Sequence, residues 1–184
     1  MRFSSARFGV PAVVAAGASV ALAVGLLLPA AASAKSAPAP KKVTDWVTLY
    51  GFVDNSPPGR AIAHPGCPNG GHQLAGGVGT FANPVSFAQV GANGPWCQVI
   101  YIPYLKKYFI HEDQCGGNCG GQPNNHVDVW AGGNGASVHN PEKAALLACE
   151  NKWTQTNTVI LNPPANEPVD TTRIFIPPTT CHGP

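Results

Sequence analysis

Glycine and proline clusters set the strongest limit on what this chain can fold into. The sequence contains 21 Gly and 19 Pro, many of them in short groups at residues 55–59, 68–71, 116–118 and 132–135. Groups of Gly, Pro, Asn and Asp of this kind form turns and loops. Because the groups recur at short intervals, only short secondary-structure elements fit between them.

The segments between the turns are rich in β-branched and aromatic residues, which predicts strands. We expect strands at residues 46–52, 60–63, 80–88, 98–102, 108–111, 126–130, 158–161 and 173–176. The Ala-rich stretch 141–151 predicts one short helix, with Asn140 as its N-cap and Pro141 at its first position. Many short strands and one helix predict an all-β barrel or sandwich with long Gly/Pro-rich loops.

The first 34 residues have the organisation of a signal peptide. Arg2 and Arg7 precede an apolar run at 8–28, and the run leads to an A-x-A pattern that ends at Ala34. The alternative is a membrane anchor, because the run approaches the length of a bilayer span. The cleavage pattern favours removal, so we expect a secreted protein without a membrane segment. Residues 35–42 are then a flexible leader and 43–184 one domain.

All six cysteines follow the predicted cleavage site, an even number that favours disulfides in an exported chain. Zinc is the competing interpretation, but the sequence has no second cysteine pair at finger spacing, so we expect no metal and no cofactor. Many pairings are possible, and the one we expect joins Cys67 to Cys97, Cys115 to Cys119 and Cys149 to Cys181.

Charge excludes one class of partner. From Val43 onward, six basic residues stand against nine acidic ones, without a basic stripe. A nucleic-acid partner is therefore not expected. We expect a monomer.

Three aspartates are candidates for acid/base chemistry: Asp54, Asp113 and Asp128. In the strand 126–130, alternation places His126, Asp128 and Trp130 on one face. A carboxyl group between an imidazole and an indole can have a raised pKa and act as a general acid. The alternative is a structural carboxylate that accepts hydrogen bonds from the main chain of a Gly-rich loop, and composition alone favours it.

The other polar residues have weaker patterns. His64, His72, His111 and His139 lack a ligand spacing, and Ser86 and Ser137 lack the context of a nucleophile elbow. Tyrosine and tryptophan on an exposed β face can stack on sugar rings. The candidates for such binding are Tyr50, Trp96, Tyr104, His126 and Trp130, while Phe52 and Tyr101 fit a core better.

Four tracts together resemble the double-psi β-barrel superfamily, in order between Val43 and Gly132. They are the segments 48–52 (TLYGF), 76–84 (GGVGTFANP), 110–115 (IHEDQC) and 126–130 (HVDVW). That superfamily includes expansins, barwin-like proteins, rare lipoprotein A-like proteins, barrel endoglucanases and the catalytic domain of one class of lytic transglycosylases. The chain looks most similar to uncharacterised secreted single-barrel proteins of actinobacteria and fungi.

The resemblance implies roles for the aspartates. Similarity to the barrel endoglucanases implies Asp128 as general acid and Asp54 as base. Similarity to the transglycosylase domain implies Asp113 and Asp128 as paired aspartates, of which Asp128 is catalytic. The chain lacks the long cysteine pattern of the endoglucanases and the second domain of expansins.

Together, these observations predict a secreted, disulfide-stabilised, six-stranded double-psi β-barrel with long Gly/Pro-rich loops and one short helix. The expected partner is a polysaccharide: peptidoglycan, chitin, cellulose or β-glucan. The protein would cleave glycosidic bonds as a glycoside hydrolase or lytic transglycosylase. The alternatives are a non-catalytic, expansin-like wall-loosening or carbohydrate-binding protein, and a barwin-like defence or inhibitor protein.

Overall fold

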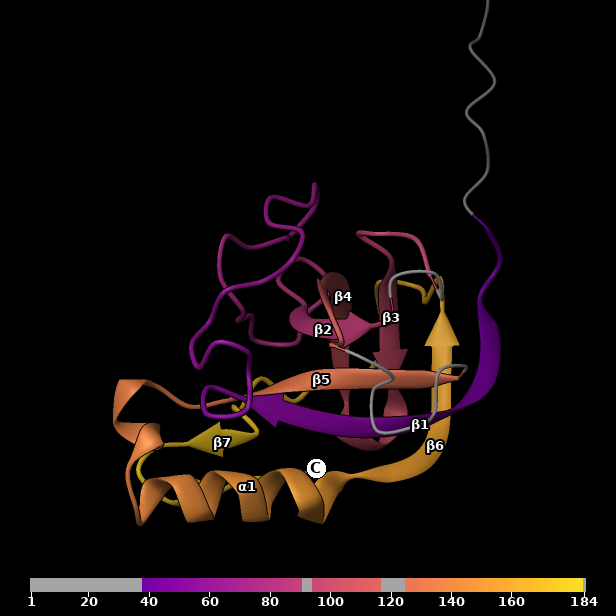
Figure 1. Cartoon of the computed structure of the whole chain (residues 1–184). Coiled ribbons are helices and arrows are strands. Elements are labelled where there is room, and N and C mark those ends of the chain that lie inside the picture. Colours follow the sequence, from indigo (N-terminus) through magenta and orange to yellow (C-terminus); the bar gives the residue numbers. More distant parts are fainter. Residues whose placement is uncertain (1–37, 91–93, 117–124, 184) are drawn as a thin grey trace, which may run out of the picture. The chain divides into compact units, whose positions relative to one another are not determined.

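A computed structural model describes residues 38–90, 94–116 and 125–183 (Figure 1). Six strands close into a barrel in the spatial order β1-β5-β2-β4-β3-β6. They are β1 (Lys41–Gly51), β2 (Val85–Gln89), β3 (Val99–Ile102), β4 (Lys107–Gln114), β5 (His126–Gly132) and β6 (Gln155–Leu161). The prediction of a mostly-β barrel with six strands and one short helix is confirmed.

The barrel mixes parallel and antiparallel pairs. β1 pairs with β5 and β2 pairs with β4 in parallel, whereas the other neighbours are antiparallel. Parallel neighbours need long crossover connections. The connections here consist of long Gly/Pro-rich loops together with the strands that lie between the two partners in the sequence.

Smaller elements complete the described chain. The helix α1 (Glu142–Trp153) packs against β1, and the short strands β7 (Phe175–Ile176) and β8 (Thr180–Cys181) form a two-stranded sheet. Two 3₁₀ turns lie at η1 (Pro103–Leu105) and η3 (Gly135–Val138). None of the helices in the described ranges is long and apolar enough to cross a membrane.

The barrel interior is filled by apolar side chains from all six strands. Val47, Phe87, Phe109, Val127 and Val129 have no solvent exposure. β2 is buried along its whole length and β4 along all but its last residue, so both strands also bury polar side chains. Burial of this apolar surface provides the main stabilisation of the barrel.

Strand β1 begins earlier than predicted. Lys41 and Lys42, assigned to a flexible leader, pair with Leu161 and Ile160 of β6. The leader boundary at residue 42 is therefore wrong, because the long partner strand β6 extends the pairing. The predicted signal peptide lies outside the described residues.

Two other local predictions are wrong. Residues 60–63 form no strand: the Arg60 carbonyl accepts from the Ala75 amide, and the Ala63 amide donates to the Asp113 carboxylate, so these groups are bound outside a ladder. Helix α1 has Pro141 rather than Asn140 at its N-cap and no side-chain cap.

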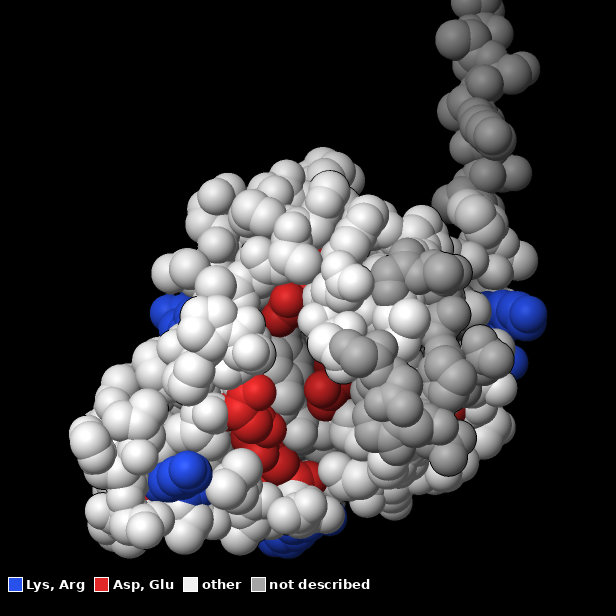
Figure 2. Space-filling model, in the orientation of Figure 1, with Lys and Arg blue, Asp and Glu red and all other residues white. Residues whose placement is uncertain are grey.

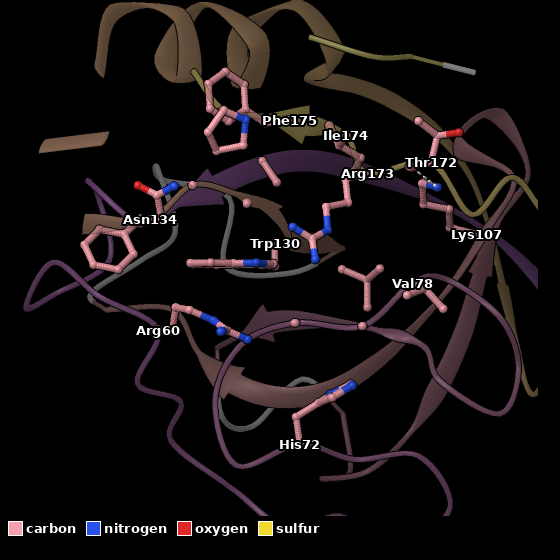
Figure 3. A pocket seen from close by; sticks show the side chains of 18 of the residues that line it. Arg60, His72, Val78, Lys107, Trp130, Asn134, Thr172, Arg173, Ile174 and Phe175 are labelled. Carbon is pink, nitrogen blue, oxygen red and sulfur yellow. Dashed lines mark hydrogen bonds between the residues drawn. The ribbon is translucent and has the colours of Figure 1, made fainter. Parts of the chain in front are cut away.

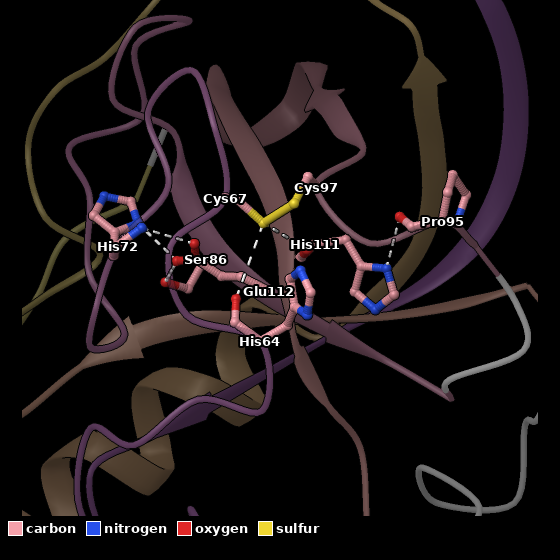
Figure 4. The surroundings of a disulfide bond; sticks show 8 residues. All are labelled: His64, Cys67, His72, Ser86, Pro95, Cys97, His111 and Glu112. Atoms are coloured by element: carbon pink, nitrogen blue, oxygen red, sulfur yellow. Dashed lines mark hydrogen bonds and ion pairs between the residues drawn. A yellow bond between two sulfur atoms is a disulfide. The ribbon is translucent and has the colours of Figure 1, made fainter.

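The described chain has two predicted disulfides. Cys67 pairs with Cys97, and Cys149 pairs with Cys181, which ties α1 to β8. The third expected pair includes Cys119, which lies outside the described residues. His64 lies within 4.8 Å of the sulfurs of Cys67 and Cys97, but both sulfurs are used by the disulfide (Figure 4).

Candidate functional site

Asp128 lies in the middle of β5, opposite Thr48 of β1 in the parallel register. The Thr48 hydroxyl donates to Oδ1 of Asp128 over 2.6 Å. Val127 and Val129 face the core with no exposure, while Asp128 on the other face is only partly buried. The alternation predicted for this strand therefore directs the carboxyl group away from the barrel interior.

The predicted polar and aromatic face is not an open surface. His126 is buried and stacks on the Trp46 ring at 4.9 Å between centroids. Trp130 is also buried, and Tyr50 meets its ring edge-on at 5.3 Å. Of the three residues on this face, Asp128 keeps the most exposure because its two neighbours are covered by aromatic rings from β1.

The environment of Asp128 raises its pKa to about 7. Burial is the main cause, and the negative charges of Asp54 and Asp113 add to it, while the hydrogen bond from Thr48 opposes it. Among the described residues, Thr48 provides its hydrogen bond, and no main-chain amide does. Asp128 is thus poised to hold a proton at neutral pH, the condition that a general acid needs.

Thr48 connects Asp128 to His126. Its hydroxyl oxygen lies 2.6 Å from Nε2 of His126 and 2.6 Å from Asp128. The hydroxyl carries one hydrogen, so when Thr48 donates to ionised Asp128, it accepts from an Nε2–H of His126. When Asp128 is protonated, both bonds can reverse. The two hydrogen bonds of Thr48 can therefore form with either protonation state of Asp128.

Asp54 has a second carboxyl group beside it, that of Glu150 on α1. Glu150 is buried, and the Asp54 carboxyl group is close enough to influence its pKa. Burial is the main cause that raises the pKa of Glu150 to about 9, followed by the charge of Asp54. Burial also raises the pKa of Asp54, although the Gly51 amide donates to its Oδ1 over 2.6 Å. At neutral pH Glu150 therefore holds its proton.

Sequence reasoning missed Glu150. The available signal was its position four residues after Leu146, which has no exposure, so both lie on one face of the helix. That face packs on Gly51: a Cβ atom at Gly51 would lie 2.6 Å from Oε1 of Glu150. A glycine at the end of β1 makes room for the carboxyl group.

Asp113 has a structural role. It is buried, and its carboxylate accepts from the Tyr50 hydroxyl at 2.7 Å and from the amides of Ala63 and Gln114 at 3.1 and 2.9 Å. These three donors occupy most of its acceptor sites and hold the side chain in place. What Asp113 contributes to Asp128 is its negative charge.

The carboxyl groups form a connected set. Asp128 senses the charges of Asp54 and Asp113, and Glu150 senses those of Asp54 and Asp128. Figure 2 shows acidic side chains gathered in a hollow of the surface, over the region of β1 and β5 in Figure 1. We call Asp54, Asp113, Asp128 and Glu150 the acidic cluster.

Two predicted sugar-binding aromatics lie in other surroundings. Trp96 stacks between His64 and His111, with ring centroids 4.9 and 4.5 Å apart, next to the Cys67–Cys97 disulfide. The Tyr104 hydroxyl donates to the Trp153 carbonyl over 2.9 Å and thereby holds the end of α1. Neither side chain contacts a member of the acidic cluster, so the predicted aromatics do not form one continuous surface.

The residues Ser86, His72 and Glu112 resemble a hydrolase triad in composition but not in order. The Ser86 hydroxyl and the His72 Nδ1 atom both bind Oε1 of Glu112 (Figure 4). In a catalytic triad the imidazole lies between the serine and the acid. Ser86 and Glu112 are also without exposure, so this set supports the fold.

Two comparisons with known proteins match most of the chain. The family model described as the DDB_G0273701 N-terminal domain matches residues 42–182. The chain is 36% identical over 148 residues to the uncharacterized protein DDB_G0273701/DDB_G0273221 of Dictyostelium discoideum, which covers 76% of this chain and 60% of that protein. The chain thus spans less than two thirds of that relative. No solved structure matches it.

Proposed function

We propose that this chain, which belongs to the DDB_G0273701 N-terminal domain family, is a secreted β-barrel protein that cleaves glycosidic bonds in a cell-wall or environmental polysaccharide. The proposal includes a barrel of the double-psi type. The resemblance of the four sequence tracts supports that type, and so does the presence of two parallel pairs, β1–β5 and β2–β4, in an otherwise antiparallel barrel.

One observation carries the proposal: Asp128 is a partly buried carboxyl group with a pKa of about 7. A structural carboxylate would be surrounded by main-chain donors, as Asp113 is. Asp128 instead has the Thr48 hydroxyl as its donor among the described residues. Glycosidases use a carboxylic acid with a raised pKa to protonate the leaving oxygen.

The proposed reaction is hydrolysis with two carboxyl groups. Asp128 gives its proton to the glycosidic oxygen as the bond from that oxygen to the anomeric carbon breaks. Asp54 takes a proton from a water molecule whose oxygen bonds to the anomeric carbon. Afterwards a proton returns from Asp54 to Asp128 through solvent, while Glu150 keeps its own.

The test is release of soluble sugar by the mature protein from peptidoglycan, chitin, cellulose and β-1,3-glucan. We expect release from one of them and expect Asp128→Asn to lower the rate by about 10²–10⁴-fold, the usual contribution of a general acid. Asp45→Asn is the matched control, because Asp45 lies on β1 and burial also raises its pKa, but it is not in the acidic cluster. Because the acid must be protonated, the rate should fall as the pH rises above about 7.

Two results would contradict the proposal. The first is product release that is unchanged in Asp128→Asn. The second is sedimentation of the protein with a polysaccharide without any release, which would support the non-catalytic, expansin-like alternative.

A further inference from the structure

A second recess in the described chain has the opposite charge. It is a cavity of about 380 Å³ with four basic side chains in its lining, those of Arg60, His72, Lys107 and Arg173. Its described lining contains no carboxylate. The volume lies in the range of small-ligand sites.

Two of these basic groups are already bound. His72 pairs with Glu112, and the buried Lys107 ammonium donates to the carbonyl oxygens of Asp170 and Thr172. The two arginines differ: among the described residues, neither guanidinium lies within 4.0 Å of a carboxylate. Two arginine charges without an acidic partner therefore remain for a ligand.

Arg60 and Arg173 extend into the cavity from different sides, and the Trp130 ring lies beside them in the view of Figure 3. Arg60 is held by a 2.7 Å bond from its Nε to the Ala75 carbonyl. That bond leaves its terminal nitrogens as donors. Arg173 is exposed and has no hydrogen bond to a described side chain or carbonyl.

Glycines form the wall beside Arg60. A Cβ atom at Gly76 would lie 3.0 Å from an Nη atom of Arg60. Gly77 has a φ of +100°, and its Cβ atom would lie 2.0 Å from the Pro84 carbonyl oxygen. This backbone accepts only glycine at position 77 without strain. The wall thus leaves the space around the guanidinium open.

The cavity borders the acidic cluster through Trp130. Its ring lines the cavity and packs against Tyr50, whose hydroxyl donates to Asp113. A ligand that reached from one recess to the other would meet arginines in the cavity and carboxyl groups next to it. An acidic group on the ligand would be attracted to the first and repelled by the second, which fixes its orientation.

We propose that this cavity binds the oxyanion of an acidic sugar unit, a carboxylate or a sulfate ester, so that the substrate class is an acidic polysaccharide. A guanidinium offers two parallel donors that can bind two oxygens of either group at once. The indole of Trp130 gives an apolar wall for the sugar ring. That the ligand is a substrate rests on the proposed function, but its binding can be measured without cleavage.

The experiment is calorimetric titration of Asp128→Asn protein, in which turnover is blocked, with three probes. They are an oligogalacturonate, its methyl ester as the neutral match, and a sulfated galactan oligosaccharide. We expect one of the acidic probes to bind at least about tenfold more tightly than the methyl ester, with an affinity that falls as salt increases. Which acidic probe wins separates carboxylate from sulfate.

Substitutions assign the binding to the cavity. Arg60→Met and Arg173→Met should each weaken the acidic probe about tenfold or more and leave the methyl ester unchanged. Arg173→Lys should lose part of the affinity, because lysine keeps the positive charge but lacks the two parallel donors of a guanidinium. Lys143→Met is the control, since it removes an exposed charge on α1 that does not line the cavity. Melting curves check that each variant is folded.

The inference is overturned if neither acidic probe binds more tightly than the ester, or if both arginine variants bind like the parent. These results differ from a failure of the proposed function. If Asp128→Asn leaves sugar release unchanged while the arginines still select acidic probes, the catalytic proposal fails and the cavity assignment stands.

Discussion

Thr48 and Asp128 face each other across the parallel pair of β1 and β5, and the Thr48 hydroxyl donates to Asp128 over 2.6 Å. This contact lowers the pKa of Asp128, against burial and the neighbouring carboxylates that raise it. The hydroxyl therefore moderates the strength of the proposed acid. It also links the acid to the His126 ring.

Replacing Thr48 with Val should raise the pKa of Asp128 further, because it removes the donor to the ionised form. The falling limb of the rate against pH should move to higher pH, and unfolding in urea should show a loss of about 1 kcal/mol. Thr44→Val is the matched control, because Thr44 is exposed on the same strand. An unchanged pKa of Asp128 in Thr48→Val would show that the contact has no influence.

Glu150 should make the protein less stable as the pH rises. Its pKa is about 9 in the folded protein against an ordinary 4.5, so between these values the folded state holds more protons than the unfolded state. Glu150→Gln keeps the size of the side chain but removes the titrating group. We expect it to be more stable than the parent at pH 8, on the order of 2 kcal/mol or about 4–8 °C in Tm.

Thermal melts from pH 5 to pH 9 measure this effect. The gain of Glu150→Gln over the parent should be small at pH 5 and should grow toward pH 9. Equal pH dependence of the two proteins would mean that Glu150 titrates at its ordinary pKa.

Local patterns predicted the strands that carry the site, but not what surrounds it. The alternation of β5 placed Asp128 opposite the buried Val127 and Val129, as the structure shows. Thr48 gave no signal, because its role depends on the register with β5. Register between strands distant in sequence is set by the whole barrel, so a single strand does not contain it.

The same reason explains the other differences. The sequence around Lys41 and Lys42 predicts a polar leader, because it does not show that β6 pairs with these residues. Glu150 joins Asp54 only because α1 packs on β1. Arg60 and Arg173 meet in one cavity although they are far apart in sequence. Contacts of this kind come from tertiary packing, which periodicity does not report.

The pair of His72 and Glu112 should stabilise the fold most at low pH. The bond to Glu112 is the main cause that raises the pKa of His72 above 6.5. Its stabilisation is therefore complete below pH 6.5 and is lost as the pH rises through the raised pKa of His72. Glu112 has no exposure, and Glu112→Gln should cost about 3–5 kcal/mol at pH 6.

Chemical denaturation of the parent and Glu112→Gln at pH 6 and pH 9 tests this. The difference between the two proteins should be larger at pH 6. His139→Gln, at an exposed histidine, should show no such trend. A difference that grows with pH would contradict the assigned role.

The disulfide between Cys149 and Cys181 should contribute strongly to stability. It closes a loop with a sequence separation of 32, for which the loss of chain entropy in the unfolded state predicts about 3–4 kcal/mol. The double variant Cys149→Ala, Cys181→Ala should still form the barrel without urea. It should unfold at a correspondingly lower urea concentration than the parent. A midpoint equal to that of the parent would contradict this expectation.

The pKa of the Asp128 carboxyl group, measured by ¹³C NMR titration of the protein, tests the central claim most directly. Comparison with Asp128→Asn assigns the resonance. We expect a pKa of about 7, which leaves a protonated acid available at neutral pH. A pKa at the ordinary aspartate value of 3.8 would show a permanently ionised carboxylate and would contradict its role as proton donor.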